Sequence, residues 1–311
     1  MNEIASYIPQ FLVRGHARID ACQCAYCRDA TPCVARAWTN HVRHSAVLQC
    51  DSVAHEALFA RDAFELHERM SEAGKADALS VWRSSVNQAC IYLLIAPGLT
   101  IRERMHAIGV LLSRLARPDV NDDDVALPID VAGELIDFAA QDVLHAQFRR
   151  LRVPDLYRRS YLRRLVKASI HLDVGAHAER TLNLKRAELQ VLSDGFLSDA
   201  LRGLEQSSAV DAFFEKHDHV WPNYFLYRCY DEVFPAVERS AYPQAFLDVC
   251  LDYFCLRNYC ALLAASDIAL DERVVSRLFA AWHRGGKASL ARDDHADPLV
   301  VGFSLIGGED D

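Results

Sequence analysis

Apolar residues recur every three or four positions along most of the chain after residue 52. This spacing places them on one face of an α-helix and is typical of amphipathic helices that pack on a core. The clearest case begins at Thr100, whose side chain can cap a helix while Glu103 reaches back to the cap residue. Comparable helical segments are predicted at residues 53–70, 77–95, 130–150, 155–172, 175–204, 208–217, 222–239, 243–265 and 271–290.

Strict alternation of apolar and polar residues, which predicts a β-strand, is almost absent. Only the segment from Leu299 to Ile306 has the character of a short strand. We therefore predict an all-α fold, a multi-helix bundle with an irregular cysteine-rich N-terminal segment. The boundaries expected are a cysteine-rich segment at residues 1–51 and a helical domain at residues 52–311.

Composition narrows the class of protein. The chain has 311 residues, 51% of them hydrophobic, which is enough for a substantial core. A net charge of −9 argues against a nucleic-acid partner, because proteins that bind nucleic acid usually present a basic face. The first residues lack the basic start and apolar run of a secretory signal, and no stretch reaches the roughly 18 apolar residues of a membrane span. We expect a cytoplasmic protein with neither nucleic acid nor membrane as partner.

One basic run contrasts with this acidic balance. Its simplest interpretation is a pair of solvated helices, interrupted at Val153 and Pro154. The alternative is a contact with an anionic partner, either a cofactor phosphate or an acidic protein surface. The run consists of Arg149, Arg150, Arg152, Arg158, Arg159, Arg163, Arg164 and Lys167.

Five cysteines gather near the start of the chain, unlike the other five, which are scattered as buried thiols usually are. In a cytoplasmic protein such a cluster more often binds a metal or does chemistry than forms disulfides. Short C-x-C and C-x2-C spacings let adjacent turns present their sulfurs to one centre. Both zinc and an iron–sulfur cluster remain possible metals, and a group of reduced buried thiols is the alternative to any metal. The clustered residues are Cys22, Cys24, Cys27, Cys33 and Cys50.

Four stretches resemble the bacterial flagellin lysine N-methylase family and occur in that family's order. Together they cover most of residues 33–290, and a final matching helix surrounds His283. The chain departs from the family pattern in a shorter cysteine-rich front end and in Asp51, which stands where the family has proline. The four stretches are Cys33-Val-Ala-Arg-Ala-Trp38, Val47 to Leu66, Leu99 to Leu112, and Pro222 to Pro235.

The resemblance implies an iron–sulfur protein that transfers a methyl group from S-adenosylmethionine to lysine side chains of a partner protein, with flagellin as a candidate. It adds Cys50 to Cys22, Cys24, Cys27 and Cys33 as ligands of a 4Fe-4S cluster, with zinc as the alternative. It also makes Asn223, Tyr224 and Tyr227 candidate cofactor-binding residues, although an asparagine after proline can cap a helix and the tyrosines can be core aromatics. No catalytic residue is assigned.

Two other functions remain open. The first is a non-enzymatic, metal-stabilised helical module that binds a partner. The second is a cluster-dependent enzyme that modifies another peptide or a small molecule. Metal analysis of a preparation made without oxygen would discriminate best among these hypotheses.

Overall fold

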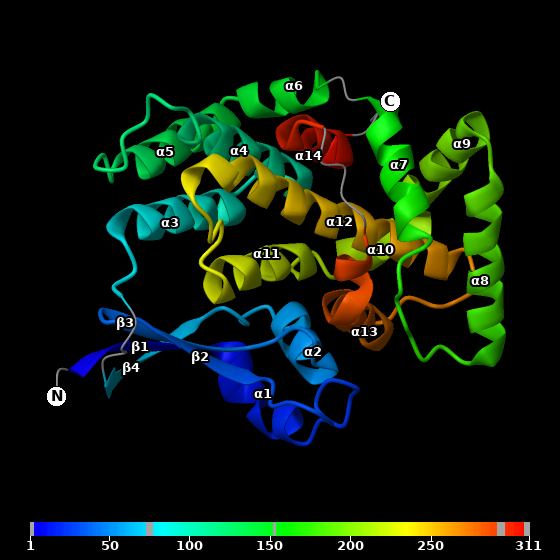
Figure 1. Cartoon of the computed structure of the whole chain (residues 1–311), viewed down its shortest axis with the longest axis horizontal. Helices are drawn as coiled ribbons and strands as arrows, with labels where there is room; N and C mark the ends of the chain where they lie inside the picture. Colours follow the sequence, from blue (N-terminus) through cyan, green and yellow to red (C-terminus); the bar gives the residue numbers. More distant parts are fainter. Residues whose placement is uncertain (1–2, 73–76, 152–153, 291–295, 308–311) are drawn as a thin grey trace.

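The computed structural model describes residues 3–72, 77–151, 154–290 and 296–307. A small sheet and two short helices form one end of the molecule, and the longer helices stack against them (Figure 1). The helical part confirms the predicted fold class. Its elements are α3 (Val81–Ile95), α4 (Ile101–Leu115), α5 (Leu127–Ala140), α6 (Val143–Arg149), α7 (Asp155–Leu165), α8 (Ala176–Val191), α9 (Asp194–Glu205), α10 (Ser208–Lys216), α11 (Val220–Asp231), α12 (Tyr242–Ala264), α13 (Glu272–Ala281) and α14 (Pro298–Ile306).

The first turn of α4 is built as its sequence predicts. The Thr100 side chain accepts a hydrogen bond from the backbone N–H of Glu103, and the Glu103 carboxylate accepts one from the backbone N–H of Thr100 at 2.8 Å. The reciprocal pair satisfies two of the N–H groups that a helix N-terminus leaves without intrahelical partners. The following residues bury the apolar face of α4 against α12 and α14.

Helix α12 runs through the centre of the helical part. Most of its 23 residues are buried, since α4, α7, α9, α10 and α14 all contact it. A helix that is apolar all round is expected in such a central position. None of the helices in the described residues combines the length and the apolar character needed to cross a bilayer.

The N-terminal end contains a sheet that the sequence did not predict. Strands β1 (Glu3–Pro9), β2 (Cys33–Ala37), β3 (His41–Ala46) and β4 (Leu66–Glu72) lie in the order β2-β3-β1-β4. Strand β1 pairs parallel with β3 and antiparallel with β4, and β2 pairs antiparallel with β3. The strands bury few side chains, so their sequences lack the apolar alternation that identifies a half-buried strand.

Several predicted elements are wrong in detail. The predicted helices at 130–150 and 175–204 are each two helices, α5 with α6 and α8 with α9. The segment from Leu299 to Ile306 is helical, because Asp297 caps α14 at the N–H groups of Leu299 and Val300 and a proline occupies its first turn. The predicted helix at 53–70 is divided. Helix α2 (Asp51–Phe59) stops before Ala60, whose backbone is extended, and strand β4 follows.

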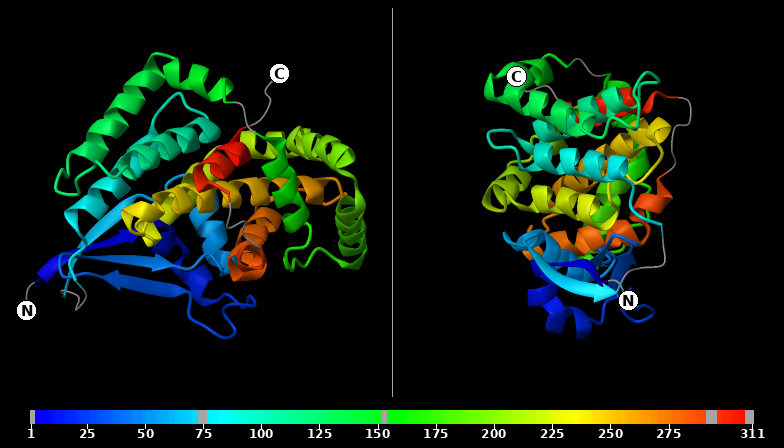
Figure 2. Two further views of the ribbon diagram at one scale, coloured as in Figure 1. Left: turned by 45° about the horizontal axis from the view of Figure 1, so that its top comes forward. Right: turned by 90° about the vertical axis from the view of Figure 1, so that its left-hand side faces the viewer.

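Helix α1 (Gln10–Asp20) connects β1 to the cysteine segment and packs against α2. Helix α1 also contacts β1, and α2 packs against α13, the orange helix in the left view of Figure 2. The division of the chain at residue 51 stays a prediction, although β4 lies beyond it and completes the N-terminal sheet.

Candidate metal centre and the adjoining cavity

Four cysteine sulfurs converge where α1 ends and α2 begins. Those of Cys22, Cys24, Cys27 and Cys50 all lie within 4.8 Å of one another. The Cys27 thiol donates a hydrogen bond to Sγ of Cys50, 3.4 Å away. We call these four residues the four-thiol group.

Local structure explains this convergence. Helix α1 ends at Asp20, and the backbone N–H of Cys22 donates to the carbonyl of Ile19, which starts a run of turns that carries three of the cysteines. Cys50 is the N-cap residue of α2. The cysteines therefore meet because the C-terminal end of α1 lies beside the N-terminal end of α2.

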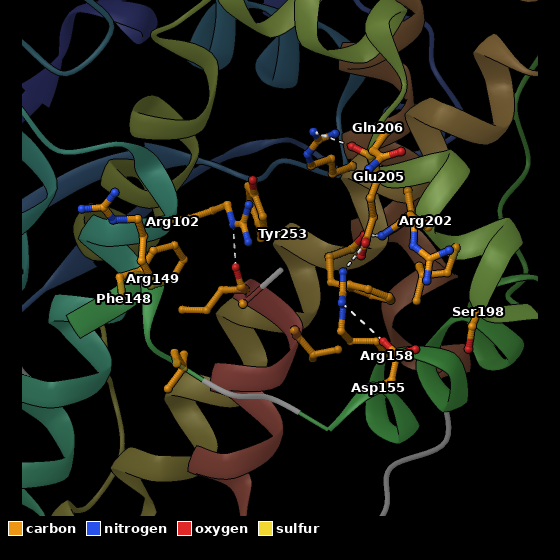
Figure 3. A pocket seen from close by; sticks show the side chains of 18 of the residues that line it. Arg102, Phe148, Arg149, Asp155, Arg158, Ser198, Arg202, Glu205, Gln206 and Tyr253 are labelled. Atoms are coloured by element: carbon orange, nitrogen blue, oxygen red, sulfur yellow. Dashed lines mark hydrogen bonds and ion pairs between the residues drawn. The ribbon is translucent and has the colours of Figure 1, made fainter. Parts of the chain in front are cut away.

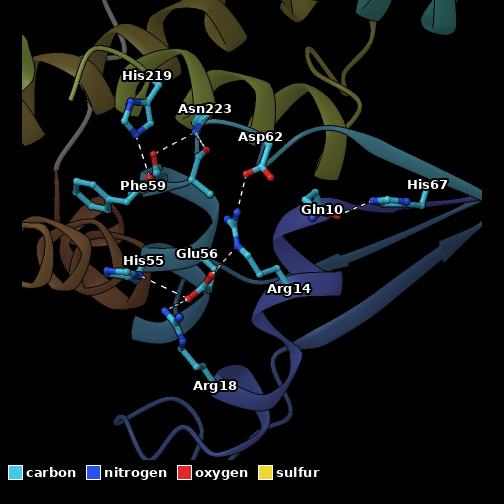
Figure 4. Close-up of polar contacts among 12 residues, drawn as sticks. Gln10, Arg14, Arg18, His55, Glu56, Phe59, Asp62, His67, His219 and Asn223 are labelled. Atoms are coloured by element: carbon cyan, nitrogen blue, oxygen red, sulfur yellow. Dashed lines mark hydrogen bonds and ion pairs between the residues drawn. The ribbon is translucent and has the colours of Figure 1, made fainter. Parts of the chain in front are cut away.

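Polar contacts between α1 and α2 hold these helices together (Figure 4). The buried carboxylate of Glu56 on α2 accepts a hydrogen bond from Arg18 at 2.6 Å and lies 3.7 Å from Arg14, both on α1. Arg14 also donates to Asp62 at 2.7 Å, beyond the C-terminal end of α2. A buried carboxylate paired with two guanidinium groups favours a single arrangement of the two helices.

The donor chemistry fits a metal ion. Four thiolates are the ligands of structural zinc and of iron–sulfur clusters. Burial raises the pKa of Cys27, and the neighbouring thiols of Cys50 and Cys24 add to this effect. Burial also brings the pKa of Cys50 to about 12, against an opposing hydrogen bond from Cys27. At Cys22 burial acts in the same direction, but hydrogen bonds led by the Ser52 side chain leave its pKa at about 7. A cation at the centre would attract all four thiolates, outweigh their mutual repulsion and lower their pKa values. The group could therefore bind a metal ion.

Cys33, the fifth predicted ligand, lies elsewhere. It is exposed at the start of β2, opposite Ala46 of β3, and is not a member of the four-thiol group. The structure thus brings together four of the five candidate ligands. The scattered cysteines are buried, as expected for core thiols: Cys90, Cys229, Cys250, Cys255 and Cys260.

A cavity of about 660 Å³ adjoins the four-thiol group, and we call it the Cys24 cavity after the cysteine that lines it. A cavity of this size can hold a small-molecule substrate. Its charged lining is mixed, with more basic than acidic groups. These are Arg28, Lys167, Arg186, Arg277 and Arg284 on the basic side and Asp51, Asp173 and Glu179 on the acidic side, with His171 also in the lining.

Arg284 links the cavity to the segment around Cys50. Its guanidinium donates to the carbonyl of Gln49 at 2.7 Å and to the carboxylate of Asp51 at 2.6 Å, on either side of Cys50. Sequence reasoning missed this residue, and Asp51 was noted only as a departure from a family motif. A signal for Arg284 was available, because it directly follows His283 and the family resemblance includes a matching helix around His283.

The three candidate cofactor-binding residues are buried in α11. The Asn223 amide donates to the carbonyls of Leu58 at 3.1 Å and Ala60 at 2.7 Å, so it closes the C-terminal end of α2 (Figure 4). The Tyr224 hydroxyl lies 3.0 Å from Nε2 of His283. Neither these residues nor Tyr227 line the Cys24 cavity. Their role in cofactor binding stays a prediction.

A buried charged network lies behind Tyr224. The Asp252 carboxylate of α12 is 0% exposed and forms ion pairs with Arg228 and with Lys287, the latter at 2.9 Å. Trp282 donates to its other oxygen at 2.9 Å. Although burial raises the pKa of Asp252, the two cations outweigh this and hold it below its usual range. The network joins α11 and α12 to the segment after α13.

The fold and the four-thiol group define a mainly helical protein with a candidate metal centre. In a comparison with known families, residues 87–287 match the FliB lysine N-methylase C-terminal domain. This match covers more than half of the chain, and the chain belongs to that family. No curated protein and no solved structure matched. The matched residues include α4, α11 and α12 but not the four-thiol group.

Proposed function

We propose that this chain is an iron–sulfur protein that transfers a methyl group from S-adenosylmethionine to lysine side chains of a partner protein. The observation that carries the proposal is Cys24, which belongs to the four-thiol group and also lines a substrate-sized cavity in a member of a lysine N-methylase family. Flagellin is the first partner to test. We expect the protein in the cytoplasm, where thiols stay reduced.

The lining of the Cys24 cavity suits such a reaction. The carboxylate of the methyl donor would pair with Arg277 or Lys167, while Asp173 would hold the incoming lysine. In the transfer the bond between sulfur and methyl carbon breaks, the bond between that carbon and the lysine nitrogen forms, and sulfur leaves as a neutral thioether. Because only a neutral amine is nucleophilic, the lysine must lose a proton, and His171 is a cavity residue that can accept it.

The identity of the metal is a separate question. A zinc ion with bonds of about 2.3 Å to four thiolates places the sulfurs roughly 3.8 Å apart. The sulfurs here lie within 4.8 Å of one another, which suits zinc, whereas a 4Fe-4S cluster needs wider spacing because each thiolate binds a different iron. The family resemblance supports the iron–sulfur cluster, and zinc is the alternative. Either would fix the turn that carries Cys24 at the edge of the cavity.

The test begins with protein purified under nitrogen. Iron, acid-labile sulfide and zinc are measured, and the absorption near 400 nm is recorded. We expect a brown protein; a colourless one with stoichiometric zinc would overturn the iron–sulfur assignment. The protein is then incubated with S-adenosylmethionine and purified flagellin, and lysine methylation is followed by mass spectrometry.

Variants test whether the reaction takes place in the Cys24 cavity. His171→Gln is expected to lower kcat by about 100-fold, the usual size of a general-base contribution, with the metal content unchanged. Arg69→Gln removes an exposed charge on β4 and should leave the rate unchanged. Folded, metal-loaded protein that methylates no protein would instead support the binding module, and methylation of a peptide or small molecule alone would support the other enzymatic alternative.

A further inference from the structure

A second cavity, of about 770 Å³, lies on the helical side of the molecule (Figure 3). It shares no lining residue with the Cys24 cavity. Helices α4, α6, α7, α9, α12 and α14 contribute side chains to it. We call it the arginine cavity, after Arg102, Arg149, Arg150, Arg158, Arg202 and Arg257.

The positive charge of this cavity is only partly compensated. Its two acidic residues, Asp155 and Glu205, both pair with Arg158, as the dashed lines in Figure 3 mark. Arg202 and Arg257 have carboxylate partners outside the lining, Asp199 and Asp211. Arg149 and Arg150 are exposed at the end of α6 and form no ion pair in the described part of the chain.

Two guanidinium groups in the lining pair with carboxylates, but each keeps one nitrogen without an acceptor among the residues described. Nε of Arg158 and Nη1 of Arg257 are inaccessible to solvent and have no hydrogen-bond partner in the described residues. The side chain of Arg158 is only 9% exposed. The excess of arginine over acidic residues in the lining favours a ligand that is rich in acceptor oxygens. Arginine is the side chain best suited to pair with phosphate or carboxylate oxygens.

We propose that the arginine cavity binds a small molecule with clustered anionic oxygens, a phosphate ester or a polycarboxylate. The cavity volume is in the range of ordinary small-molecule sites. Arg149 and Arg150 pair with the anion at the cavity edge, and the other arginines of the lining contribute positive charge around it. The proposed ligand would contact part of the basic run found in the sequence. This binding is independent of the proposed methyl transfer.

The test measures binding of inorganic pyrophosphate and of citrate to the full chain by isothermal titration calorimetry. Binding of pyrophosphate alone assigns the site to phosphate esters, and binding of citrate assigns it to polycarboxylates or to both. The Arg149→Gln/Arg150→Gln variant should weaken binding by about tenfold or more, because it removes two charged contacts at a partly exposed site. Affinity should also fall as salt is raised.

The matched control is Arg69→Gln/Arg273→Gln, which removes the same charge from exposed positions outside both cavities. It should bind as tightly as the wild type. The proposal is overturned if neither probe binds, if the α6 variant keeps wild-type affinity, or if the control loses as much affinity as that variant. Circular dichroism of each variant checks that it is folded.

Discussion

Gly15 of α1 and Glu56 of α2 approach so closely that a Cβ at position 15 would lie 2.7 Å from Cγ of Glu56. Real Cβ atoms essentially never make contacts this short, so no larger residue fits without movement of the helices or of the buried carboxylate. Three cysteines of the four-thiol group follow α1, and Cys50 begins α2. The contact between these two residues therefore helps set the distance between the two halves of the group.

Gly15→Ala should destabilise the protein and lower its metal content. Overpacking of this kind typically costs about 1–3 kcal/mol, and separation of the helices would spread the thiols. Urea unfolding and metal-to-protein ratios measure the two effects. Gly133→Ala is the matched control, because Gly133 lies within α5 with open space at its Cβ position, and alanine there should be neutral or stabilising. Equal behaviour of the two variants would show that the contact does not control the group.

Substitution of single cysteines should separate ligands from bystanders. Cys27→Ser should lose most of the metal, since a metal site bound by four thiolates loses one of its ligands. Cys33→Ser should keep it, because this sulfur is exposed and outside the four-thiol group. Metal content and thermal unfolding are measured together for both. Loss of metal from the Cys33 variant would instead support the five-ligand set expected from the sequence.

The helices could be predicted because their buried faces leave a periodic signal. The Thr100 capping box and the apolar stripe after it needed no tertiary information. The sheet gave no such signal, because β4 reads Leu-His-Glu-Arg-Met-Ser-Glu and β1 buries only Ser6 and Pro9. Its order depends on pairing between residues as far apart as Glu3 and Glu72, which local periodicity does not encode.

The candidate site also has one part that the sequence predicts and another that only tertiary packing determines. Spacing identified the four cysteines between residues 22 and 33, and the resemblance added Cys50. Only the packing of α1 on α2 separates Cys33 from the other four. The Cys24 cavity could not be foreseen, because its lining comes from several distant segments that have no common motif. Arg284 is an example: it reaches back to Asp51, 233 positions earlier in the chain.

Asp252→Asn should strongly destabilise the helical part. The substitution leaves Arg228 and Lys287 buried or half-buried without their shared carboxylate, and breaking a buried ion pair from one side costs about 3–5 kcal/mol. Urea unfolding at neutral pH measures the change. Asp199→Asn is the control, because its pair with Arg202 is exposed on both sides and should contribute less than about 1 kcal/mol. A small effect of Asp252→Asn would mean that the two cations find other acceptors.

His106 should make the protein less stable in mild acid. Its ring lies between Phe148 and Phe303, with centroids 5.6 and 5.4 Å away, and its Nδ1 atom has no hydrogen-bond partner in the described residues. Burial lowers the pKa of His106 to about 4 from an ordinary value of 6.5, against a smaller opposing effect of Glu103. The unfolded chain therefore binds a proton below pH 6.5 that the folded chain refuses until about pH 4.

Stability should consequently fall as the pH drops through this window, and His106 should contribute up to about 1.4 kcal/mol per pH unit. His106→Leu should reduce the slope of unfolding free energy against pH by the equivalent of about one proton. Part of the slope should remain, because burial also lowers the pKa of His283, to about 3. Urea unfolding at several values between pH 7 and 4.5 gives the slope. Met105→Leu is the control: this buried residue of the same helix carries no titrating group, so the slope should stay as in the wild type. An unchanged slope in His106→Leu would show that the folded protein admits the proton at His106.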